Sequence, residues 1–278
     1  MAEPVTASRP RTPRGPGRYV ARVIVIAYLF FLVAWPLSLV GQNTFEGGLD
    51  NLRGILEDPD VVHALRLSLL VAVLAVVINT LFGVGVSLLL VRYQFPGKRL
   101  LSALLDVPLS VSPIVVGLAL VLVYGGRTGW FGPTLESAGF QVIFATPGIV
   151  MATVFVALPL VIREVVPVLE EVGDEQEQAA RSLGAGGFQT FWRITLPAIK
   201  WGVIYGVVLS LARSLGEFGA VKVVSGNVLG ETRTTTLVVE EKYLNFDKGG
   251  AYAAAFLLAL VAVAAIVVVS ALRPKEHK

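Results

Sequence analysis

The chain has 278 residues, of which 55 % are hydrophobic and 15 % are charged, and its formal net charge is +3. Soluble domains contain about 45–50 % apolar and about 25 % charged residues, so this composition indicates that lipid surrounds much of the chain. The sequence has no cysteine and only two distant histidines, His63 and His277, which excludes disulfides and a cysteine- or histidine-rich metal site. It also lacks the basic and aromatic pattern that binds nucleic acid.

The N-terminal region combines a polar tail with an apolar segment. Residues 1–18 hold several arginines and prolines and few apolar side chains, which predicts a disordered cytoplasmic tail. Residues 19–40 are then apolar for about 22 positions, enough for a helix to cross a bilayer about 30 Å thick. A signal peptide would have about 7–15 apolar residues and then a small-residue cleavage site, which this sequence lacks. We therefore interpret the segment as a retained membrane anchor.

Five further apolar segments follow, and each is too long for an ordinary strand. With the anchor they predict an all-α, polytopic membrane protein whose six transmembrane helices lie between residues 19 and 272, followed by a second cytoplasmic tail at 273–278. Six spans place both termini on one side of the membrane. The five segments are Leu67–Val91, Ser102–Tyr124, Pro147–Val168, Trp201–Val224 and Ala251–Leu272.

The basic residues indicate which side is cytoplasmic, because inner loops carry an excess of lysine and arginine. With the N-terminus inside, 15 of the 23 basic residues lie on the inner side and five on the outer side. Both termini are therefore predicted to be cytoplasmic. The five outer residues are Arg53, Arg127, Arg233, Lys242 and Lys248, and three more lie at or within spans: Arg66, Arg213 and Lys222.

The second span carries small or short polar residues at intervals of four. These residues are Ala75, Asn79, Gly83 and Ser87. Small side chains at this spacing let helices approach closely in lipid, so we expect a packing face here rather than a ligand site.

The polar segment at about 170–200, between the fourth and fifth spans, predicts two short helices outside the membrane. Asp174 is a candidate N-cap and Glu177, three residues later, nearly completes a capping box. Gly184 supplies a helix stop. A second helix is expected from Gly187 until Pro197, which would end it before the fifth span begins.

The second short helix would expose apolar side chains at Phe188, Phe191 and Trp192. Apolar groups outside the membrane need a cover. The loop is either a structural cap on the helix bundle or a docking site for a cytoplasmic partner, and the residue pattern alone favours neither.

The same segment resembles the EAA loop of ABC importer permeases, whose pattern is E-A-A-x3-G-x9-I-x-L-P. Every spacing of that pattern is met here by Gln178, Ala179, Ala180, Gly184, Ile194, Leu196 and Pro197. Gln178 stands in place of the usual glutamate and lacks its charge, but Glu177 offers a carboxylate one position earlier. The resemblance implies the type I (MetI-like) permease fold. It also implies that the loop inserts into a groove on a separate ATPase subunit and transmits its closure to the spans.

Three further stretches resemble the sulfate/thiosulfate permease family of the CysW type. They are Leu105–Pro108 with Val111–Pro113 and Gly117; Gly129–Pro133; and Ala212–Ala220, continuing through Val224–Asn227 to Gly230–Thr232. The G-E-F-G-A block in the last stretch is shared with molybdate and tungstate permeases, which are the alternative. The resemblance implies four kinds of partner: a paralogous CysT-like (or CysU-like) permease subunit, a dimer of CysA-like ATPase subunits, an extracytoplasmic sulfate-binding protein, and the anion itself.

Several polar residues are predicted within or beside the spans. Arg213 and Glu217 are four apart and carry charges that are costly in lipid, so they either neutralise each other or line the anion route as a gate. Pro108 and Pro113 should interrupt the third span, where Ser110 and Ser112 would satisfy freed backbone groups or face the pore. Asp106 is interpreted as a helix cap or an ion-pair partner.

Other functions fit the sequence less well. A membrane enzyme would need a nucleophile with a base or a metal cluster, and a passive channel has no use for a coupling loop. The segment Ser225–Gly250 is polar and would either contact a binding protein or be a plain solvated loop. The sequence lacks the phosphate-binding motif G-x4-G-K-[ST], so we expect no bound cofactor and no catalytic activity in this chain, with ATP hydrolysed by the partner ATPase.

Overall fold

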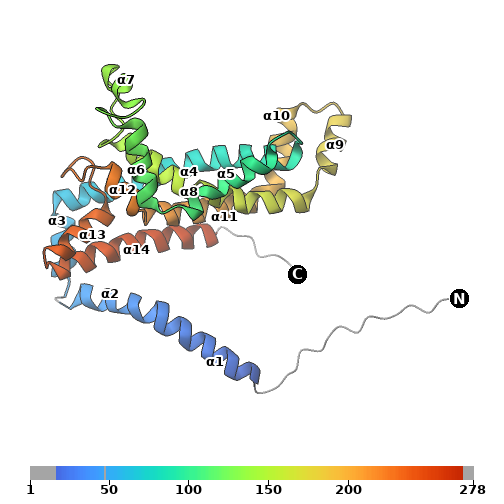
Figure 1. Ribbon diagram of the computed structural model, residues 1–278. Coiled ribbons are helices and arrows are strands. Elements are labelled where there is room, and N and C mark those ends of the chain that lie inside the picture. Colours follow the sequence, from blue (N-terminus) through green and yellow to red (C-terminus); the bar gives the residue numbers. More distant parts are fainter. Residues whose placement is uncertain (1–16, 47, 272–278) are drawn as a thin grey trace.

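The computed structural model describes residues 17–46 and 48–271, and these residues form helices and no strand (Figure 1). The all-α prediction is therefore confirmed. Of the predicted tails at 1–18 and 273–278, residues 1–16 and 273–278 lie outside the described residues, whereas Gly17 and Arg18 already belong to a helix, so the first boundary was placed too late. The long helices are α4 (Pro59–Arg92), α8 (Thr146–Val172), α11 (Leu196–Leu215) and α14 (Lys248–Ala271).

Shorter helices connect and flank the long ones. They are α1 (Gly17–Leu29), α2 (Trp35–Phe45), α3 (Asp50–Glu57), α5 (Lys98–Ser110), α6 (Pro113–Tyr124), α7 (Gly132–Ser137), α9 (Glu175–Ser182), α10 (Gly187–Thr190), α12 (Gly219–Val224) and α13 (Thr235–Leu244), with π-helical stretches η1 (Phe30–Ala34) and η2 (Phe191–Thr195).

The centre of the bundle is formed by α4, α8 and α11, which pack against one another in all three pairs. A Cβ atom at Gly83 of α4 would lie 2.8 Å from Cγ1 of Val161, and one at Gly206 of α11 would lie 2.9 Å from Cα of the same valine. Fully buried Val161 of α8 therefore lies between two glycines. All four small residues of the predicted packing face are buried, which confirms that prediction: Ala75, Asn79, Gly83 and Ser87.

The N-terminal helices extend away from this bundle (Figure 1). Residues Tyr19–Phe45 form an apolar helix of 27 residues, and none of its most apolar stretch is buried within the chain. Its end is attached to α14 by an edge-on contact between Phe45 and Phe256, with ring centroids 5.4 Å apart. The predicted first span is thus a continuous helix that leaves most of its apolar surface uncovered.

Each π-helical stretch is followed closely by a proline. η1 ends two residues before Pro36, and η2 ends two residues before Pro197. A proline lacks the amide that would bond the preceding turn and crowds its carbonyl, and a wider turn relieves that conflict. The prediction that Pro197 ends the second short helix was therefore wrong, because one continuous helix runs from Gly187 to Leu215.

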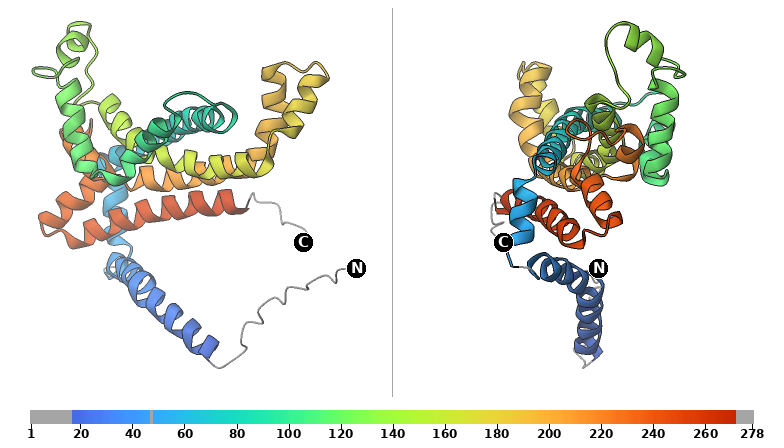
Figure 2. Two further views of the ribbon diagram at one scale, coloured as in Figure 1. Left: turned by 45° about the vertical axis from the view of Figure 1, so that its right-hand side comes forward. Right: turned by 90° about the vertical axis from the view of Figure 1, so that its left-hand side faces the viewer.

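The third predicted span is broken rather than straight. α5 and α6 meet at an angle of 112° between Ser110 and Pro113, and α6 with α7 rises away from the bundle (Figure 2). The interruption predicted at Pro113 is confirmed. The interruption predicted at Pro108 was wrong, because α5 continues past it to Ser110.

The fifth predicted span was placed too far along the chain. α11 ends at Leu215 and a short break precedes α12, so the expected continuous segment Trp201–Val224 is wrong in its second half. The outer segment 225–250 is not a plain loop either, because it contains α13 with buried Leu237 and Val238. Within the described residues, four helices are long and apolar enough to cross a membrane, and the bent α5–α6 pair gives a fifth. The four are Tyr19–Phe45, Pro59–Arg92, Thr146–Val172 and Gly187–Leu215. α14 is apolar along Lys248–Ala264, and the count of six spans stays a prediction.

Candidate functional site: the helical loop and the central ion pair

The loop predicted to contact a partner projects from one end of the bundle as α9 and α10 (Figure 1). Gly184 has a φ of +87°, in the left-handed region that favours glycine. The amides of Gly184 and Ala185 donate to the carbonyls of Arg181 and Ala180, both at 3.0 Å. These bonds close the end of α9 as a glycine C-cap does, which confirms the predicted helix stop.

Large apolar side chains are exposed on this loop. Leu183 is 90 % exposed, Phe188 79 % and Trp192 52 %, and the rings of Phe188 and Trp192 are 6.0 Å apart. Phe191 was wrongly predicted to join them, since it packs against the buried cluster around Val165 and Ile199 instead.

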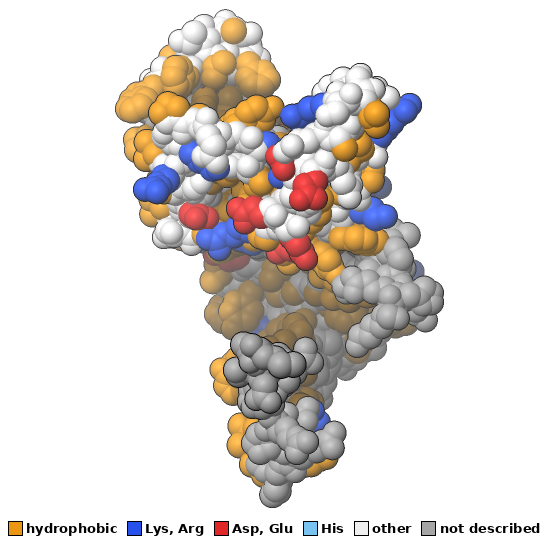
Figure 3. All heavy atoms as spheres, turned by 90° about the vertical axis from the view of Figure 1, so that its right-hand side faces the viewer, with side chains coloured by type: hydrophobic (Ala, Val, Ile, Leu, Met, Phe, Trp, Pro, Cys, Tyr) orange, Lys and Arg blue, Asp and Glu red, His pale blue; other side chains and the backbone are white. Residues whose placement is uncertain are grey.

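Figure 3 looks onto this end and shows acidic side chains gathered there; the exposed ones are Glu170, Glu171, Asp174 and Glu175.

The remaining motif residues divide between the surface and the interior. Gln178, Ala179 and Pro197 are exposed, Ile194 and Leu196 are half-buried, and Ala180 is buried. The second half of the motif lies on the continuous helix that becomes α11, so the loop joins a core helix without a break.

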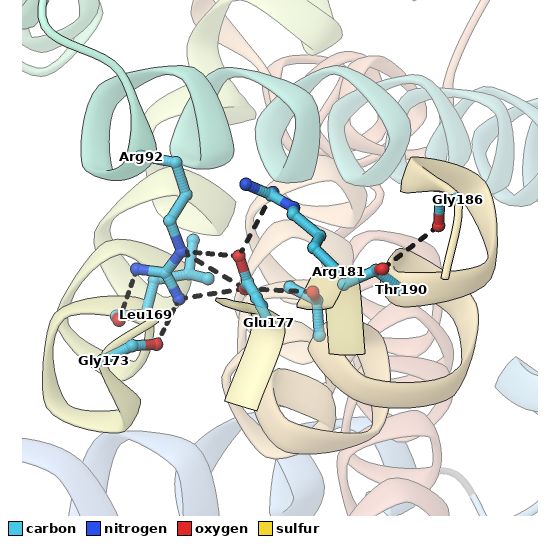
Figure 4. A network of polar contacts seen from close by, with 8 residues as sticks. Arg92, Leu169, Gly173, Glu177, Arg181, Gly186 and Thr190 are labelled. Carbon is cyan, nitrogen blue, oxygen red and sulfur yellow. Dashed lines mark hydrogen bonds and ion pairs between the residues drawn. The ribbon is translucent and has the colours of Figure 1, made fainter. Parts of the chain in front are cut away.

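Glu177 is the buried ionic centre of the loop (Figure 4). Nε of Arg92, the last residue of α4, donates to both carboxylate oxygens of Glu177, at 3.2 and 3.1 Å, and Nη2 donates to Oε1 at 3.1 Å. The same guanidinium donates to the carbonyls of Leu169 at 3.1 Å and Gly173 at 2.6 Å. Thr195 of η2 donates to Oε1 of Glu177 at 3.0 Å. We call these five residues the Arg92 clasp.

The predicted capping box does not form. Asp174 occupies the N-cap position of α9 but makes no side-chain cap bond. Glu177 turns toward Arg92 instead, because a charged guanidinium is a stronger partner for its carboxylate than a backbone amide. Its second cation is Arg181, whose Nη2 lies 3.9 Å from Oε2.

A second arginine–glutamate pair lies in the interior of the bundle. Nη1 of Arg213 is 2.8 Å from Oε2 of Glu217, whose side chain is 2 % exposed. Oε1 of Glu217 accepts a bond from the amide of Ala220 at 2.9 Å. The two charges were predicted on one helix face, but Glu217 lies in the break after α11, where its carboxylate caps α12.

The structure brings this break close to the break in the third span. A Cβ atom at Gly219 would lie 3.1 Å from Cβ of Pro113, and α6 approaches α12 so closely that a Cβ at Gly117 would lie 2.8 Å from Val223. Ser110 and Ser112 are exposed beside this contact, and Ser112 precedes α6 without a side-chain cap bond. The two breaks that carry the residues predicted for the anion route therefore lie against each other.

Asp106 is an ion-pair partner, one of the two roles predicted for it. Its Oδ1 accepts from Nη2 of Arg163 on α8 at 2.9 Å, and both side chains are more than half exposed.

Sequence reasoning missed three side chains of this site and the two backbone carbonyls that Arg92 binds. Arg92 counted only as one more basic residue at the end of a span, and Thr195 and Leu183 carried no signal of their own. One feature of the sequence could have pointed to Arg92: its predicted span ends on the same side of the membrane as the loop that carries the Glu177 carboxylate.

Comparison with known proteins places the chain in a family. Residues 79–278 match the model described as "Binding-protein-dependent transport system inner membrane component". The chain is 47 % identical over 255 residues to the sulfate transport system permease protein CysW of Synechococcus elongatus, covering 92 % of this chain and 89 % of that one.

Two further relatives bear on fold and paralogy. The sulfate transport system permease protein CysT of Salmonella typhimurium is 36 % identical over 90 % of this chain and 88 % of its own. A crystal structure of a bacterial ABC transporter involved in the import of the acidic polysaccharide alginate contains a chain that superposes with a TM-score of 0.77, at 17 % identity, over 94 % of this chain and 96 % of that one. At that identity the likeness concerns the fold, and one fold thus serves relatives named for different cargoes.

Proposed function

This chain belongs to the family of binding-protein-dependent transport system inner membrane components, and we propose that it is the membrane-spanning permease subunit of an ABC importer for sulfate and thiosulfate. The observation that carries the proposal is the 47 % identity to a sulfate permease subunit over 92 % of the chain. The chain is a multi-pass membrane protein, and we propose that it lies in a bacterial cytoplasmic membrane with both termini on the cytoplasmic side.

The helical loop is the proposed contact with the ATPase subunits. Its three most exposed apolar side chains, Leu183, Phe188 and Trp192, lie on the part of the chain that projects from the bundle and leave apolar surface for a partner to cover. Gln178 and Ala179 of the motif are exposed on the same loop, and the small side chain of Ala179 permits close approach of a partner. In this proposal Gly184 sets the turn of the loop, while Ile194, Leu196 and Pro197 carry its motion into α11.

The adjacent breaks at Ser110–Pro113 and Leu215–Gly219 are the proposed gate of the anion route. Broken helices leave backbone groups without internal partners, which membranes tolerate beside protein or a water-filled cavity. Glu217 accepts a hydrogen bond from Ala220 and lies in ion-pair contact with Arg213, whereas the side chain of Arg213 keeps 36 % of its surface exposed. We propose that the pair holds the break in place and that Arg213 presents the positive charge a passing anion meets.

The proposed transporter needs three further components. A paralogous CysT-like permease subunit completes the pore, which is consistent with the 36 % identity between this chain and a CysT protein. A pair of CysA-like ATPase subunits supplies the energy, so this chain itself binds no cofactor and catalyses no reaction. An extracytoplasmic binding protein delivers the anion to the end opposite the loop. Molybdate or tungstate is the alternative cargo, because the Gly216–Ala220 block resembles those permeases too.

Uptake of labelled sulfate in a host without its own sulfate permease tests the proposal. The chain would be supplied with the paralogue, ATPase and binding protein, with and without excess thiosulfate or molybdate. We expect uptake that requires this chain and is blocked by thiosulfate but not by molybdate. Uptake of molybdate alone, or of neither anion with all subunits assembled, would keep the permease class and overturn the cargo.

A further inference from the structure

The Arg92 clasp lies at the base of the helical loop, yet none of its five residues occupies a defined position of the loop motif. We propose that Arg92 is a positioning residue that fixes α9 to the ends of α4 and α8, so that a displacement of the loop reaches both long helices. The inference rests on the proposed function, because only a permease that docks an ATPase has such a displacement to transmit.

The packing of α9 explains why a polar clasp is needed there. Only Glu177 and Ala180 of its eight residues are buried, so α9 has no broad apolar face that could fix its orientation against the bundle. The residue that follows it, Leu183, is 90 % exposed. The direction of α9 therefore depends mainly on the bonds that Glu177 makes.

The guanidinium of Arg92 binds α8 and α9 at the same time and so fixes their relative orientation. Its Nη1 and Nη2 donate to the Leu169 and Gly173 carbonyls at the end of α8, while Nε and Nη2 hold the Glu177 carboxylate of α9. Arginine presents its donors in a rigid planar fork, so rotation of α9 relative to α8 would break one set of bonds or the other. The side chains of Arg92 and Glu177 are only 12 % and 8 % exposed, so water competes weakly for them.

The carboxylate of Glu177 also bonds toward α11, the third helix at the centre of the bundle. Thr195 donates to Oε1 of Glu177 from η2, and η2 continues directly into α11. One carboxylate on α9 thus faces α4 through Arg92 (Figure 4), and it faces α11 through Thr195. The arrangement differs from a simple ion pair, because the cation also satisfies two carbonyl oxygens that can only accept.

The first test compares uptake with ATP hydrolysis in vesicles that hold the complete transporter and its binding protein. We expect Arg92→Ala to lower sulfate uptake per ATP hydrolysed by about tenfold and Arg92→Lys by about two- to fivefold, within the range known for residues that carry coupling. Lysine keeps the charge but loses the planar fork. Arg53→Ala is the matched control, because Arg53 forms an exposed pair with Glu57 at the opposite end of the bundle, and we expect no change.

A charge exchange separates the clasp from an ordinary ion pair. In the double variant Arg92→Glu with Glu177→Arg, a simple pair would be restored. We expect no rescue, because a glutamate at position 92 would face the carbonyl oxygens of Leu169 and Gly173. Recovery of coupling to the wild-type value in the exchanged variant would overturn the proposal.

The second test needs no cargo, so it stands apart from the choice of anion. The chain has no natural cysteine, and Gln176→Cys with Arg99→Cys would place two spin labels on exposed sites of α9 and α5 in the assembled transporter. We expect the distance distribution to be narrow with Arg92 and clearly broader with Arg92→Lys. An unchanged distribution together with unchanged uptake per ATP in Arg92→Lys would overturn the positioning role, even if Arg92→Ala fails to assemble. Absence of sulfate uptake in the wild type would instead count against the proposed cargo alone.

Discussion

Two arginine–glutamate pairs within the described residues have a buried glutamate but lie in different settings. Arg92 and Glu177 are 85 residues apart in sequence and join α4, α8 and α9 at the loop end. Arg213 and Glu217 are four residues apart and lie at a break inside the bundle. Both glutamates are buried, yet one holds separate helices together and the other shapes a single chain segment.

The difference lies in what each carboxylate and each arginine also binds. The second carboxylate oxygen of Glu217 accepts a hydrogen bond from the amide of Ala220 at the start of α12. The contacts of this pair therefore stay within one chain segment. Arg92 donates its remaining hydrogen bonds to two carbonyls at the end of α8, so that pair connects separate helices. The side chain of Arg213 keeps 36 % of its surface exposed, against 12 % for Arg92. Arg213 is therefore accessible to an anion, whereas the donors of Arg92 are engaged within the chain and hold its helices together.

The largest expected effect follows from removing the cation of the interior pair. Arg213→Ala would leave the Glu217 carboxylate buried without a counter-charge, which costs about 3–5 kcal/mol. We expect sulfate uptake to be lost while the transporter still assembles. Uptake in vesicles and thermal unfolding would be measured together with Arg213→Ala/Glu217→Gln, which should regain stability but not uptake. Arg163→Ala, which breaks an exposed pair, should change stability by less than about 1 kcal/mol. Unimpaired uptake in Arg213→Ala would make Arg213 a spectator.

A smaller effect is expected at the turn that follows the clasp. Gly184→Val would place a β-branched residue in the left-handed region at a cost of about 1–2 kcal/mol. We expect lower uptake per ATP hydrolysed, because the strained turn would alter the angle between α9 and α10. Gly184→Asn is the control, since asparagine adopts this conformation more readily and should retain coupling. Equal coupling in both variants would show that the turn geometry is not critical.

The hydroxyl that links the clasp to α11 should matter less. Thr195→Val removes one bond to Glu177 at nearly constant volume, which corresponds to about 1 kcal/mol. We expect a slightly lower unfolding temperature and a small decrease in uptake per ATP, both restored in Thr195→Ser. A decrease as large as that of Arg92→Ala would contradict the ranking of the two contacts.

The smallest effect is expected at the position where the motif departs from its usual form. Gln178 is exposed, and Glu177 already supplies the buried carboxylate. Gln178→Glu should therefore leave uptake unchanged within experimental error. A large gain or loss would mean that the charge at position 178 contacts the ATPase directly.

The sequence predicted the features that depend on local chemistry. Apolar length identified the long helices, Gly184 the end of α9, and the four-residue spacing from Ala75 to Ser87 the packing face. The sequence-based predictions failed where contacts with distant residues, or a compensating change in helix geometry, determine the local structure. Pro197 does not end its helix because η2 absorbs the conflict, and Glu177 leaves the capping box because Arg92, 85 residues away, is the better partner. The exposure of Phe191 depended on the three-dimensional cluster around Ile199, which no local pattern reveals.

The contact between the helical loop and the ATPase is the central claim, and site-specific photo-cross-linking tests it most directly. A benzophenone label would be attached to Phe188→Cys in the otherwise cysteine-free chain, within the assembled, uptake-competent transporter. The control is Trp130→Cys, which is 81 % exposed beside α7 at the other end of the bundle. We predict an adduct with the ATPase subunit from position 188 and none from position 130. No adduct from position 188, or equal adducts from both positions, would contradict the account.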